Sequence, residues 1–260
     1  MRILITNDDG ITAPGLKVAE SIARDLAGPD GEIWTVAPAF EQSGVSHCIS
    51  YIRPMRLEQL GERRFAVEGS PADCVLAALH EIMADSPPDL VLSGVNKGHN
   101  VAEDTLYSGT IGGAMEAAMH GIKSIAMSQY YGIRGTELPD SFEVAQVHGT
   151  ATCRRLLEAA TWQDHTYGVF YNINFPNTDP ANVRGTMATR QGHRANATFK
   201  VEQQRSPNGR NYLWLAHAAH NASAAAGSDA REASEGWITV TPLQADLTAE
   251  KILNDMDGLF

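Results

Sequence analysis

Residues 1–10 read Met-Arg-Ile-Leu-Ile-Thr-Asn-Asp-Asp-Gly, and the rest of the chain is organised around this stretch. Ile3, Leu4 and Ile5 form a short apolar run of the kind that a buried parallel strand uses. Asp8 and Asp9 follow it, and two adjacent carboxylates repel each other unless a cation or a shared proton neutralises them. The stretch therefore predicts a buried strand that ends in a cation-binding loop.

Strands and helices are expected to alternate from this strand to residue 176. Apolar residues recur at helical spacing over residues 16–26, and residues 32–36 follow as a second strand, which makes a right-handed βαβ unit. Further strands are expected over 89–92, 124–128 and 169–173, and further helices from Ser70, from Tyr107 and over 142–160. This order predicts an α/β protein with a doubly wound, mostly parallel sheet.

Two segments are less regular. Short strands are expected over 49–52, 55–57 and 64–67, around a turn at Leu60-Gly61. Beyond them, Ser70 suits a helix cap, Pro71 suits the first helical position, and Asp73 resembles the acidic partner of a capping box.

The alternation fails from about residue 185. Extended segments are expected over 186–189, 212–216 and 237–241, a loop over 216–230 and a short helix over 248–256. We therefore expect a catalytic core over residues 1–184 and an extended, β-rich oligomerisation arm over residues 185–260, which packs on a partner chain.

The composition limits the possible partners and the compartment. The 260 residues include 20 basic and 31 acidic side chains, a formal charge of −11, which disfavours long nucleic acids and anionic membranes. Three widely separated cysteines, Cys48, Cys74 and Cys153, are expected to be buried free thiols, as in a reducing compartment. Because no leader pattern or membrane-length apolar run is present, we expect a cytoplasmic protein.

Oxygen ligands follow three of the expected strands. The first strand leads to Asp8 and Asp9, with Asn7 beside them as an expected substrate-binding residue. The second strand leads to Ser43, and a later one leads to Ser93 and Asn96. Ligands bind beyond the carboxyl ends of the strands in open parallel sheets. Carboxylate, amide and hydroxyl oxygens suit Mg²⁺, Mn²⁺ or Ca²⁺ better than zinc. Taken alone, the Asp-Asp pair also fits a plain turn with one capping and one solvated aspartate.

A second element is the segment Tyr107-Ser108-Gly109-Thr110, which opens a helix. Small hydroxyl residues and glycine at a helix N-terminus expose backbone N–H groups and form an anion site. An ordinary cap by Ser108 is the simpler alternative. The segment lacks the lysine of a P-loop, and no Gly-x-Gly-x-x-Gly follows the first strand, so a dinucleotide cofactor is not expected.

A metal beside an anion-binding helix end indicates phosphate ester chemistry. Asp8 or Asp9 would take a proton from the attacking water, or one of them would act as a covalent nucleophile. A Mg²⁺-binding phospho-receiver module is the alternative from another class. Receivers need a further aspartate at the end of a central strand, where this chain has Ser93 and Gly94. Among the histidines, His47 and His99 lie in the loops of the expected site.

At this point the chain resembles the survival protein SurE family. The resemblance is carried by segments in family order: Ile3–Gly10, Gln42–Gly44, Gly69–Cys74, Ser93–Asn96 with Gly98 and Asn100, Tyr107–Thr110 with Glu116, Asn172–Asn174 with Pro176, and Thr241–Leu243 with Asp246–Thr248.

The resemblance implies a metal-dependent phosphatase of nucleoside 5′- and 3′-monophosphates. It implies a Rossmann-like core and a C-terminal arm exchanged within a homodimer or homotetramer. By position, it implies one divalent metal per subunit and two sets of site residues: metal ligands Asp8, Asp9, Ser43 and Asn96, and phosphate-binding residues Asn96, Ser108, Gly109 and Thr110. The chain departs from the family pattern at Lys97 and His99, in residues 127–140, and in the alanine-rich stretch near 222–226.

Overall fold

The computed structural model describes the whole chain except residues 131–141, 164–165, 195–198, 218–223, 257 and 260. Its centre is a sheet of nine strands in the order β3-β4-β2-β1-β5-β6-β7-β11-β8. The strands of this sheet are β1 (Arg2–Thr6), β2 (Glu32–Pro38), β3 (Leu57–Gly61), β4 (Arg64–Val67), β5 (Leu90–Lys97), β6 (Lys123–Gln129), β7 (Phe170–Phe175), β8 (Thr186–Ala188) and β11 (Ile238–Leu243).

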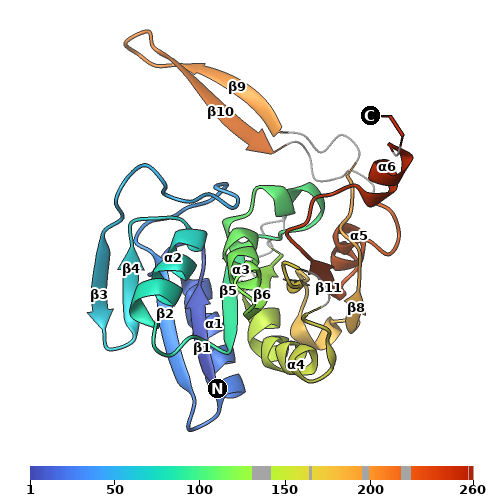
Figure 1. The fold of residues 1–260 in the computed structure, drawn as a ribbon. Helices are drawn as coiled ribbons and strands as arrows, with labels where there is room; N and C mark the ends of the chain where they lie inside the picture. The colour runs from blue at the N-terminus through green and yellow to red at the C-terminus, as the bar shows by residue number, and fades with distance from the viewer. Residues whose placement is uncertain (131–141, 164–165, 195–198, 218–223, 257, 260) are drawn as a thin grey trace.

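The sheet is mostly parallel, as predicted. β2, β1, β5, β6 and β7 pair in parallel, whereas β3 and β11 run antiparallel to their neighbours β4 and β7. Helices cover the sheet on both faces (Figure 1). The helices are α1 (Pro14–Ala27), α2 (Pro71–Ala77), α3 (Gly109–Met119), α4 (Glu143–Ala159), α5 (Asp229–Ser234) and α6 (Glu250–Asp255).

The strand order places the first ten residues at the middle of the molecule. Ile3, Leu4 and Ile5 are fully buried, with α1 packed on one face of β1 and α2 on the other. The order reverses beside β1, because the chain moves from β1 out to β2 and then back to β5 on the other side. Such a switch point opens a crevice at the carboxyl ends of the strands.

Local signals in the sequence are confirmed at two helix ends. Ser70 accepts a hydrogen bond from Asp73 N at 3.1 Å, and the Asp73 carboxylate accepts one from Ser70 N at 2.8 Å, which completes the capping box of α2. Ser108 caps α3 by accepting a hydrogen bond from Ile111 N at 3.2 Å.

Four expectations are wrong. Residues 49–52 form no strand, and β3 runs through the turn expected at Leu60-Gly61. β5 continues past the expected end to Lys97, so Ser93 lies inside the strand and is fully buried. The change from apolar to polar residues along β5 therefore does not mark the end of the strand. Cys48 is exposed, whereas Cys74 and Cys153 are buried, and all three are free thiols.

The C-terminal segment divides between the sheet and a projecting hairpin. β8 and β11 join the main sheet, whereas β9 (Phe199–Arg205) and β10 (Asn211–His217) form a separate antiparallel hairpin that extends from the body (Figure 1). β9 is not predicted by the sequence pattern. Within the described residues, no helix is long and apolar enough to cross a membrane.

Candidate active site

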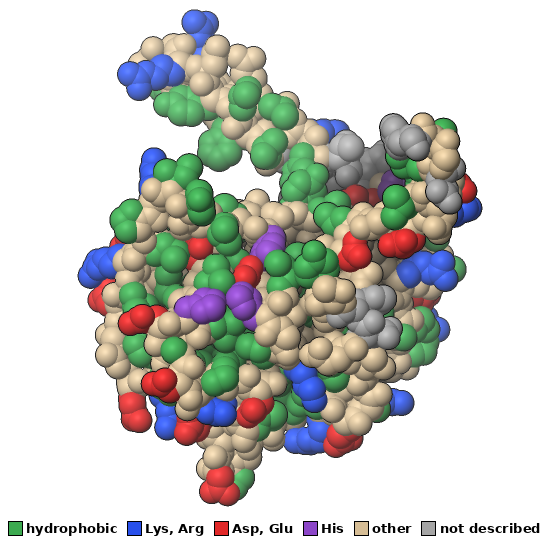
Figure 2. Space-filling view, viewed as in Figure 1, with side chains coloured by type: hydrophobic (Ala, Val, Ile, Leu, Met, Phe, Trp, Pro, Cys, Tyr) green, Lys and Arg blue, Asp and Glu red, His purple; other side chains and the backbone are tan. Residues whose placement is uncertain are grey.

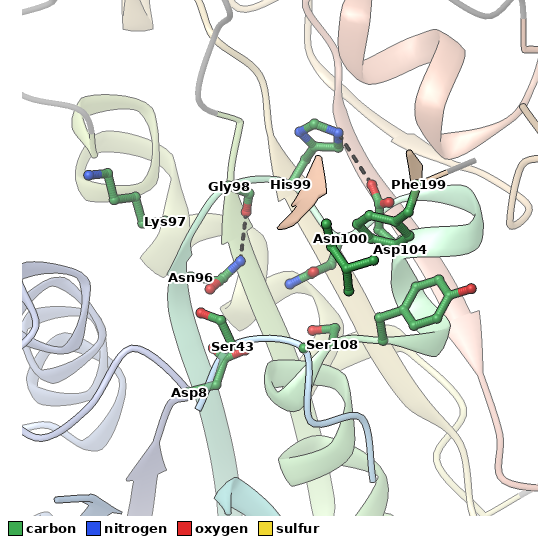
Figure 3. Close-up of a pocket in the computed structure, with 13 residues that line it drawn as sticks. Asp8, Ser43, Asn96, Lys97, Gly98, His99, Asn100, Asp104, Ser108 and Phe199 are labelled. Carbon is green, nitrogen blue, oxygen red and sulfur yellow. Dashed lines mark hydrogen bonds and ion pairs between the residues drawn. The ribbon is translucent and has the colours of Figure 1, made fainter. Parts of the chain in front are cut away.

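A cavity of about 530 Å³ opens beyond the carboxyl ends of β1 and β5. Asp8, Ser43 and Asn96 lie close together on one side of it, and Asp104 and Phe199 lie on the other (Figure 3). The structure therefore brings together residues from three strand exits that are separated by up to 88 positions in the chain.

Asp8 is buried where its charge is costly. Its side chain accepts a hydrogen bond from Thr110 Oγ1 at 2.6 Å. Burial raises the pKa of Asp8 to about 6; the Thr110 hydroxyl opposes this rise and the charge of Asp9 adds to it. A carboxylate held in this way gains stability from a cation or a proton.

Asp9 is half-buried and connects two strand ends. Its Oδ2 accepts a hydrogen bond from Lys97 N at 3.0 Å, which joins the loop after β1 to the end of β5. Burial raises the pKa of Asp9, against that hydrogen bond, and the charge of Glu41 contributes to the rise. The pair thus has two acidic groups that both resist ionisation.

Ser43 and Asn96 add neutral oxygen atoms to the same cavity. Ser43 Oγ donates to Glu41 Oε1 at 2.8 Å, so its lone pairs remain as acceptors. Asn96 Nδ2 donates to Gly98 O at 3.0 Å, which leaves its amide oxygen to coordinate a cation and its second N–H to donate. Such oxygens suit a hard divalent cation.

The N-terminus of α3 packs directly against Asp8. A Cβ atom on Gly109 would lie 2.8 Å from the Asp8 Cβ and 3.2 Å from its Oδ2, so only glycine allows this approach. Ser108 lines the cavity, whereas Thr110 is fully buried with its hydroxyl directed at Asp8. The helix end and Asp8 therefore form one continuous site, whereas Asp9 lies outside the cavity lining.

Asn7 lies outside this cavity lining. It is fully buried, donates to Gly10 O at 2.9 Å and accepts from Gly10 N at 3.2 Å. Its side chain closes the turn that presents the two aspartates.

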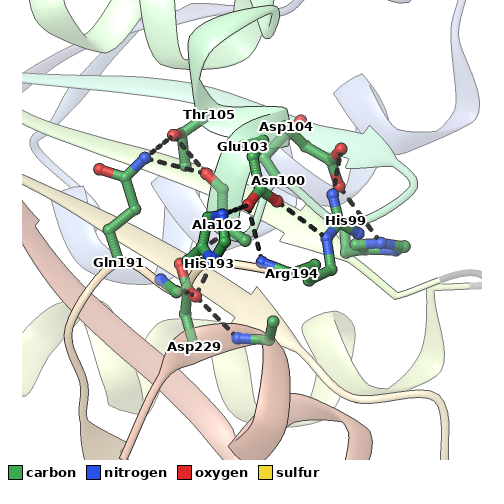
Figure 4. Close-up of polar contacts among 12 residues, drawn as sticks. His99, Asn100, Ala102, Glu103, Asp104, Thr105, Gln191, His193, Arg194 and Asp229 are labelled. Carbon is green, nitrogen blue, oxygen red and sulfur yellow. Dashed lines mark hydrogen bonds and ion pairs between the residues drawn. The ribbon is translucent and has the colours of Figure 1, made fainter. Parts of the chain in front are cut away.

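A buried polar framework holds the loop after β5. Asn100 N donates to Asn174 Oδ1 at 2.8 Å, and Asn172 Nδ2 donates to Asn100 O at 2.7 Å. Asp229 accepts from Ala102 N at 3.1 Å (Figure 4). Asn172 and Asn174 therefore position the loop after β5, although neither of them lines the cavity.

Charged residues surround the far side of the cavity. Arg194 donates to Asp104 Oδ1 at 2.6 Å and to Glu103 Oε2 at 3.1 Å (Figure 4). His99 lines the cavity, lies 3.4 Å from Asp104 Oδ2 and stacks on Tyr130 with ring centroids 4.1 Å apart. Sequence reasoning missed Asp104 and Phe199, which line the cavity, and Arg194, which pairs with Asp104, because nothing in their local sequence indicates that they lie on this side of the site.

His47 faces α3 rather than this cavity. Its Nε2 lies 2.5 Å from Glu116 Oε2, and His120 Nε2 lies 3.1 Å from Glu116 Oε1. His80 contacts His120 edge to face, and histidine side chains gather on this surface (Figure 2).

Residues 3–198 match the family model described as survival protein SurE. The chain belongs to the SurE family. It is 56% identical over 258 residues to the 5′-nucleotidase SurE of Ruegeria pomeroyi, covering 99% of each chain. It is also 56% identical to the 5′-nucleotidase SurE of Cereibacter sphaeroides, over 100% of this chain and 99% of that protein.

The SurE fold is shared with a solved structure. The crystal structure of the SurE protein from Aquifex aeolicus superposes with a TM-score of 0.79 at 32% identity, and the match covers 100% of this chain and 99% of that one. The Rossmann-like, doubly wound sheet predicted from the sequence is therefore the SurE fold. β5 carries Ser93 and Gly94 where a phospho-receiver needs an aspartate, so the site itself also disfavours that alternative.

Proposed function

We propose that this SurE family member is a divalent-metal-dependent phosphomonoesterase that hydrolyses nucleoside 5′- and 3′-monophosphates to a nucleoside and phosphate. The single observation that carries the proposal is the close packing of Asp8, the first member of the Asp8–Asp9 pair, against the N-terminus of α3. The names of the Ruegeria and Cereibacter relatives support a nucleotidase.

The residues present fit one divalent cation per subunit, such as Mg²⁺ or Mn²⁺. Asp8, Asp9, Ser43 and Asn96 would hold it, and the raised pKa of Asp8 reflects a buried charge that a cation would neutralise. Within the described residues, no three side chains of His, Cys, Asp or Glu gather to hold a metal. The proposed set therefore has two carboxylates completed by a hydroxyl and an amide. A bound cation would neutralise phosphoryl charge and lower the pKa of the attacking water.

The protein groups divide the remaining tasks. Ser108, the backbone N–H groups that begin α3 at Gly109, and the Asn96 amide bind the phosphate oxygens. The Thr110 hydroxyl donates a hydrogen bond to Asp8. Thr110 thereby keeps Asp8 beside the start of α3, where the phosphate would bind. Asp8 or Asp9 accepts the proton of the attacking water, and transfer of a proton from that carboxyl group to the leaving oxygen releases the nucleoside as an alcohol.

The assembly and location are further parts of this proposal. Large apolar side chains are exposed on the hairpin and on α6, and exposed apolar patches mark protein interfaces. We therefore propose that residues 185–260 serve as an oligomerisation arm in a homodimer or homotetramer. The free cysteines fit a reducing compartment such as the cytoplasm.

Phosphate release from nucleoside 5′- and 3′-monophosphates tests the proposal, measured with Mg²⁺, Mn²⁺ or Co²⁺ after treatment with a chelator. We expect metal-dependent turnover that Asp9→Asn abolishes without loss of the folded state. Near wild-type turnover by Asp9→Asn with metal restored contradicts the metal-site model. Stable phosphorylation of an aspartate by acetyl phosphate, without turnover, favours a receiver. A trapped phosphoenzyme during turnover favours covalent catalysis over direct attack by water.

A further inference from the structure

The cavity extends well beyond the groups that would hold a cation and a phosphate. Phe199 and Asp104 lie across it from Asp8 and Ser43 (Figure 3). Its volume of about 530 Å³ is in the range that holds a whole small organic ligand. The far side therefore has room for the remainder of a phosphorylated substrate.

An aromatic corner forms part of this far side. The Tyr107 and Phe199 rings meet edge to face, with centroids 5.3 Å apart and planes at 87°, and Leu215 adds an aliphatic surface to the same cavity. Tyr107 is 48% exposed, Phe199 is 38% exposed and Leu215 is 72% exposed, although burying such apolar groups is favourable. A flat, partly apolar ligand would cover surface that the protein leaves open to water.

Tyr107 connects this corner to the anion site. It directly precedes Ser108, the cap of α3, so the two Cα atoms are about 3.8 Å apart. Its carbonyl accepts a hydrogen bond from Ser46 N at 2.9 Å, from the loop that also carries Ser43. The aromatic surface therefore begins one residue from the phosphate position, within the reach of a single nucleotide.

The opposite wall comes from the hairpin. In its antiparallel register Leu215 lies opposite Val201, two residues from Phe199, so Phe199 and Leu215 project from the same face. Tyr212 lies three residues from Leu215 and projects from the other face. The face of the hairpin that carries Phe199 and Leu215 therefore lines the cavity.

We propose that Tyr107, Phe199 and Leu215 form the subsite for the nucleobase, an inference that rests on the proposed nucleotidase function. The base stacks on the aromatic rings while its phosphate occupies the start of α3. Stacking accepts every base, because each has a π-face. The site therefore selects for the presence of a base more than for its identity, and these three residues determine specificity without taking part in the chemical step.

The test compares AMP with ribose 5-phosphate, which keeps the sugar and phosphate but lacks the base. For Phe199→Ala, we expect the ratio of kcat/KM for AMP to kcat/KM for ribose 5-phosphate to fall about tenfold or more. Phe199→Trp should restore the ratio. Tyr212→Ala is the matched control, since it removes an exposed aromatic ring from the other face of the same hairpin, and it should leave the ratio unchanged. Light scattering checks that each variant keeps the wild-type oligomeric state.

Equal losses on both substrates, or no loss on either, overturn the subsite. If the wild-type protein releases phosphate from neither compound, the proposed nucleotidase function fails instead. Calorimetric binding of AMP and ribose 5-phosphate to the same variants then decides the subsite. A preference for AMP that Phe199→Ala removes supports it, and equal binding of the two compounds contradicts it.

Discussion

Asp8 links the stability of the protein to its proposed chemistry at the scale of a single residue. Its pKa is raised to about 6 because it is buried beside another carboxylate. A carboxyl group whose pKa is higher in the folded than in the unfolded state binds more protons when folded. The free energy of unfolding therefore decreases as pH rises through the interval between the two values and stays reduced above it.

A divalent cation should reverse this loss and should do so more strongly at high pH. At pH 5 the proton competes for Asp8, so the apparent dissociation constant rises about tenfold relative to pH 8, and the stabilisation falls by about 1.4 kcal/mol. Thermal unfolding with and without Mn²⁺ at the two pH values measures this difference. An equal increase in Tm at both pH values contradicts binding at Asp8.

Asp8→Asn should separate stability from activity. Without metal and above pH 6, removing the buried charge should raise the free energy of unfolding by up to about 3 kcal/mol, since each pKa unit corresponds to about 1.4 kcal/mol. The amide oxygen can still accept from Thr110. Turnover should fall by more than about a hundredfold. Denaturant unfolding and phosphate release test both parts, and a variant that is less stable than wild type at pH 8 contradicts the first.

Gly109→Ala tests the contact between α3 and Asp8. The added Cβ would lie 2.8 Å from the Asp8 Cβ, so the carboxylate or the helix must move. We expect a loss of about a hundredfold in kcat/KM, because a small misplacement of reacting groups is costly. Gly61→Ala is the control, since its added Cβ would have its nearest contact at 3.6 Å and lies in exposed β3. Comparable losses in the two variants contradict a specific role of Gly109.

At the scale of elements, the loop after β2 is fastened to α3 by a buried carboxylate. Burial by itself would raise the pKa of Glu116, but its hydrogen bonds and charge interactions with His47 and His120 outweigh burial and lower it. A Cβ on Gly112 would lie 2.5 Å from Ser46 O, so the loop backbone rests directly on the helix. The loop that carries Ser43 and helix α3 are therefore held together by direct backbone packing and by this carboxylate.

Glu116→Gln should weaken this attachment. We expect a loss of about 1–3 kcal/mol in the free energy of unfolding near pH 6, because a buried charge-assisted pair loses one partner. Since the folded pKa of Glu116 is depressed, its contribution is present above the unfolded pKa and disappears as pH falls through the folded value. The difference between variant and wild type should therefore shrink below about pH 4. Chemical denaturation over this pH range measures it.

Glu58→Gln provides the control for that series. Glu58 pairs with Arg56 at 3.1 Å, but the two side chains are 51% and 65% exposed, so the change should cost less than about 1 kcal/mol. If Glu116→Gln lowers the free energy of unfolding by as little as Glu58→Gln does, or if its loss stays unchanged at low pH, Glu116 does not fasten the loop to α3.

At the scale of the whole molecule, apolar side chains remain outside the core. Hydrophobic groups cover much of the hairpin (Figure 2). α6 has six residues, none of them buried, yet Ile252 and Leu253 are apolar. A helix this short is unstable alone, so the arrangement favours a partner subunit that covers it.

Replacing Ile252 and Leu253 together with glutamate should therefore dissociate the proposed oligomer. Light scattering should report a larger assembly for the wild-type protein and a smaller one for the double variant. Glu250→Gln, on the same helix, should leave the mass unchanged. A wild-type protein that is monomeric at micromolar concentration contradicts the proposed role of the arm.

Much of the architecture follows from local patterns. The apolar run Ile3–Ile5, the helical spacing of α1 and the caps at Ser70 and Ser108 act within a few residues, so sequence alone predicts them. The acidic pair Asp8–Asp9 and the oxygen groups of Ser43 and Asn96 are also visible, because parallel strands deliver their exits to one edge of a sheet.

Only the tertiary structure decided what depends on distant segments. The continuation of β5 through Ser93 follows from its pairing with β6, and the direction of the Thr110 hydroxyl follows from the burial of Asp8. Phe199 reaches the cavity because the base of the hairpin lies beside Tyr107, and the 92 positions of sequence that separate the two residues carry no local signal of this contact. The sequence by itself determined which groups are candidates for the proposed chemistry, whereas packing determined what surrounds them, because contacts between remote side chains depend on the whole fold.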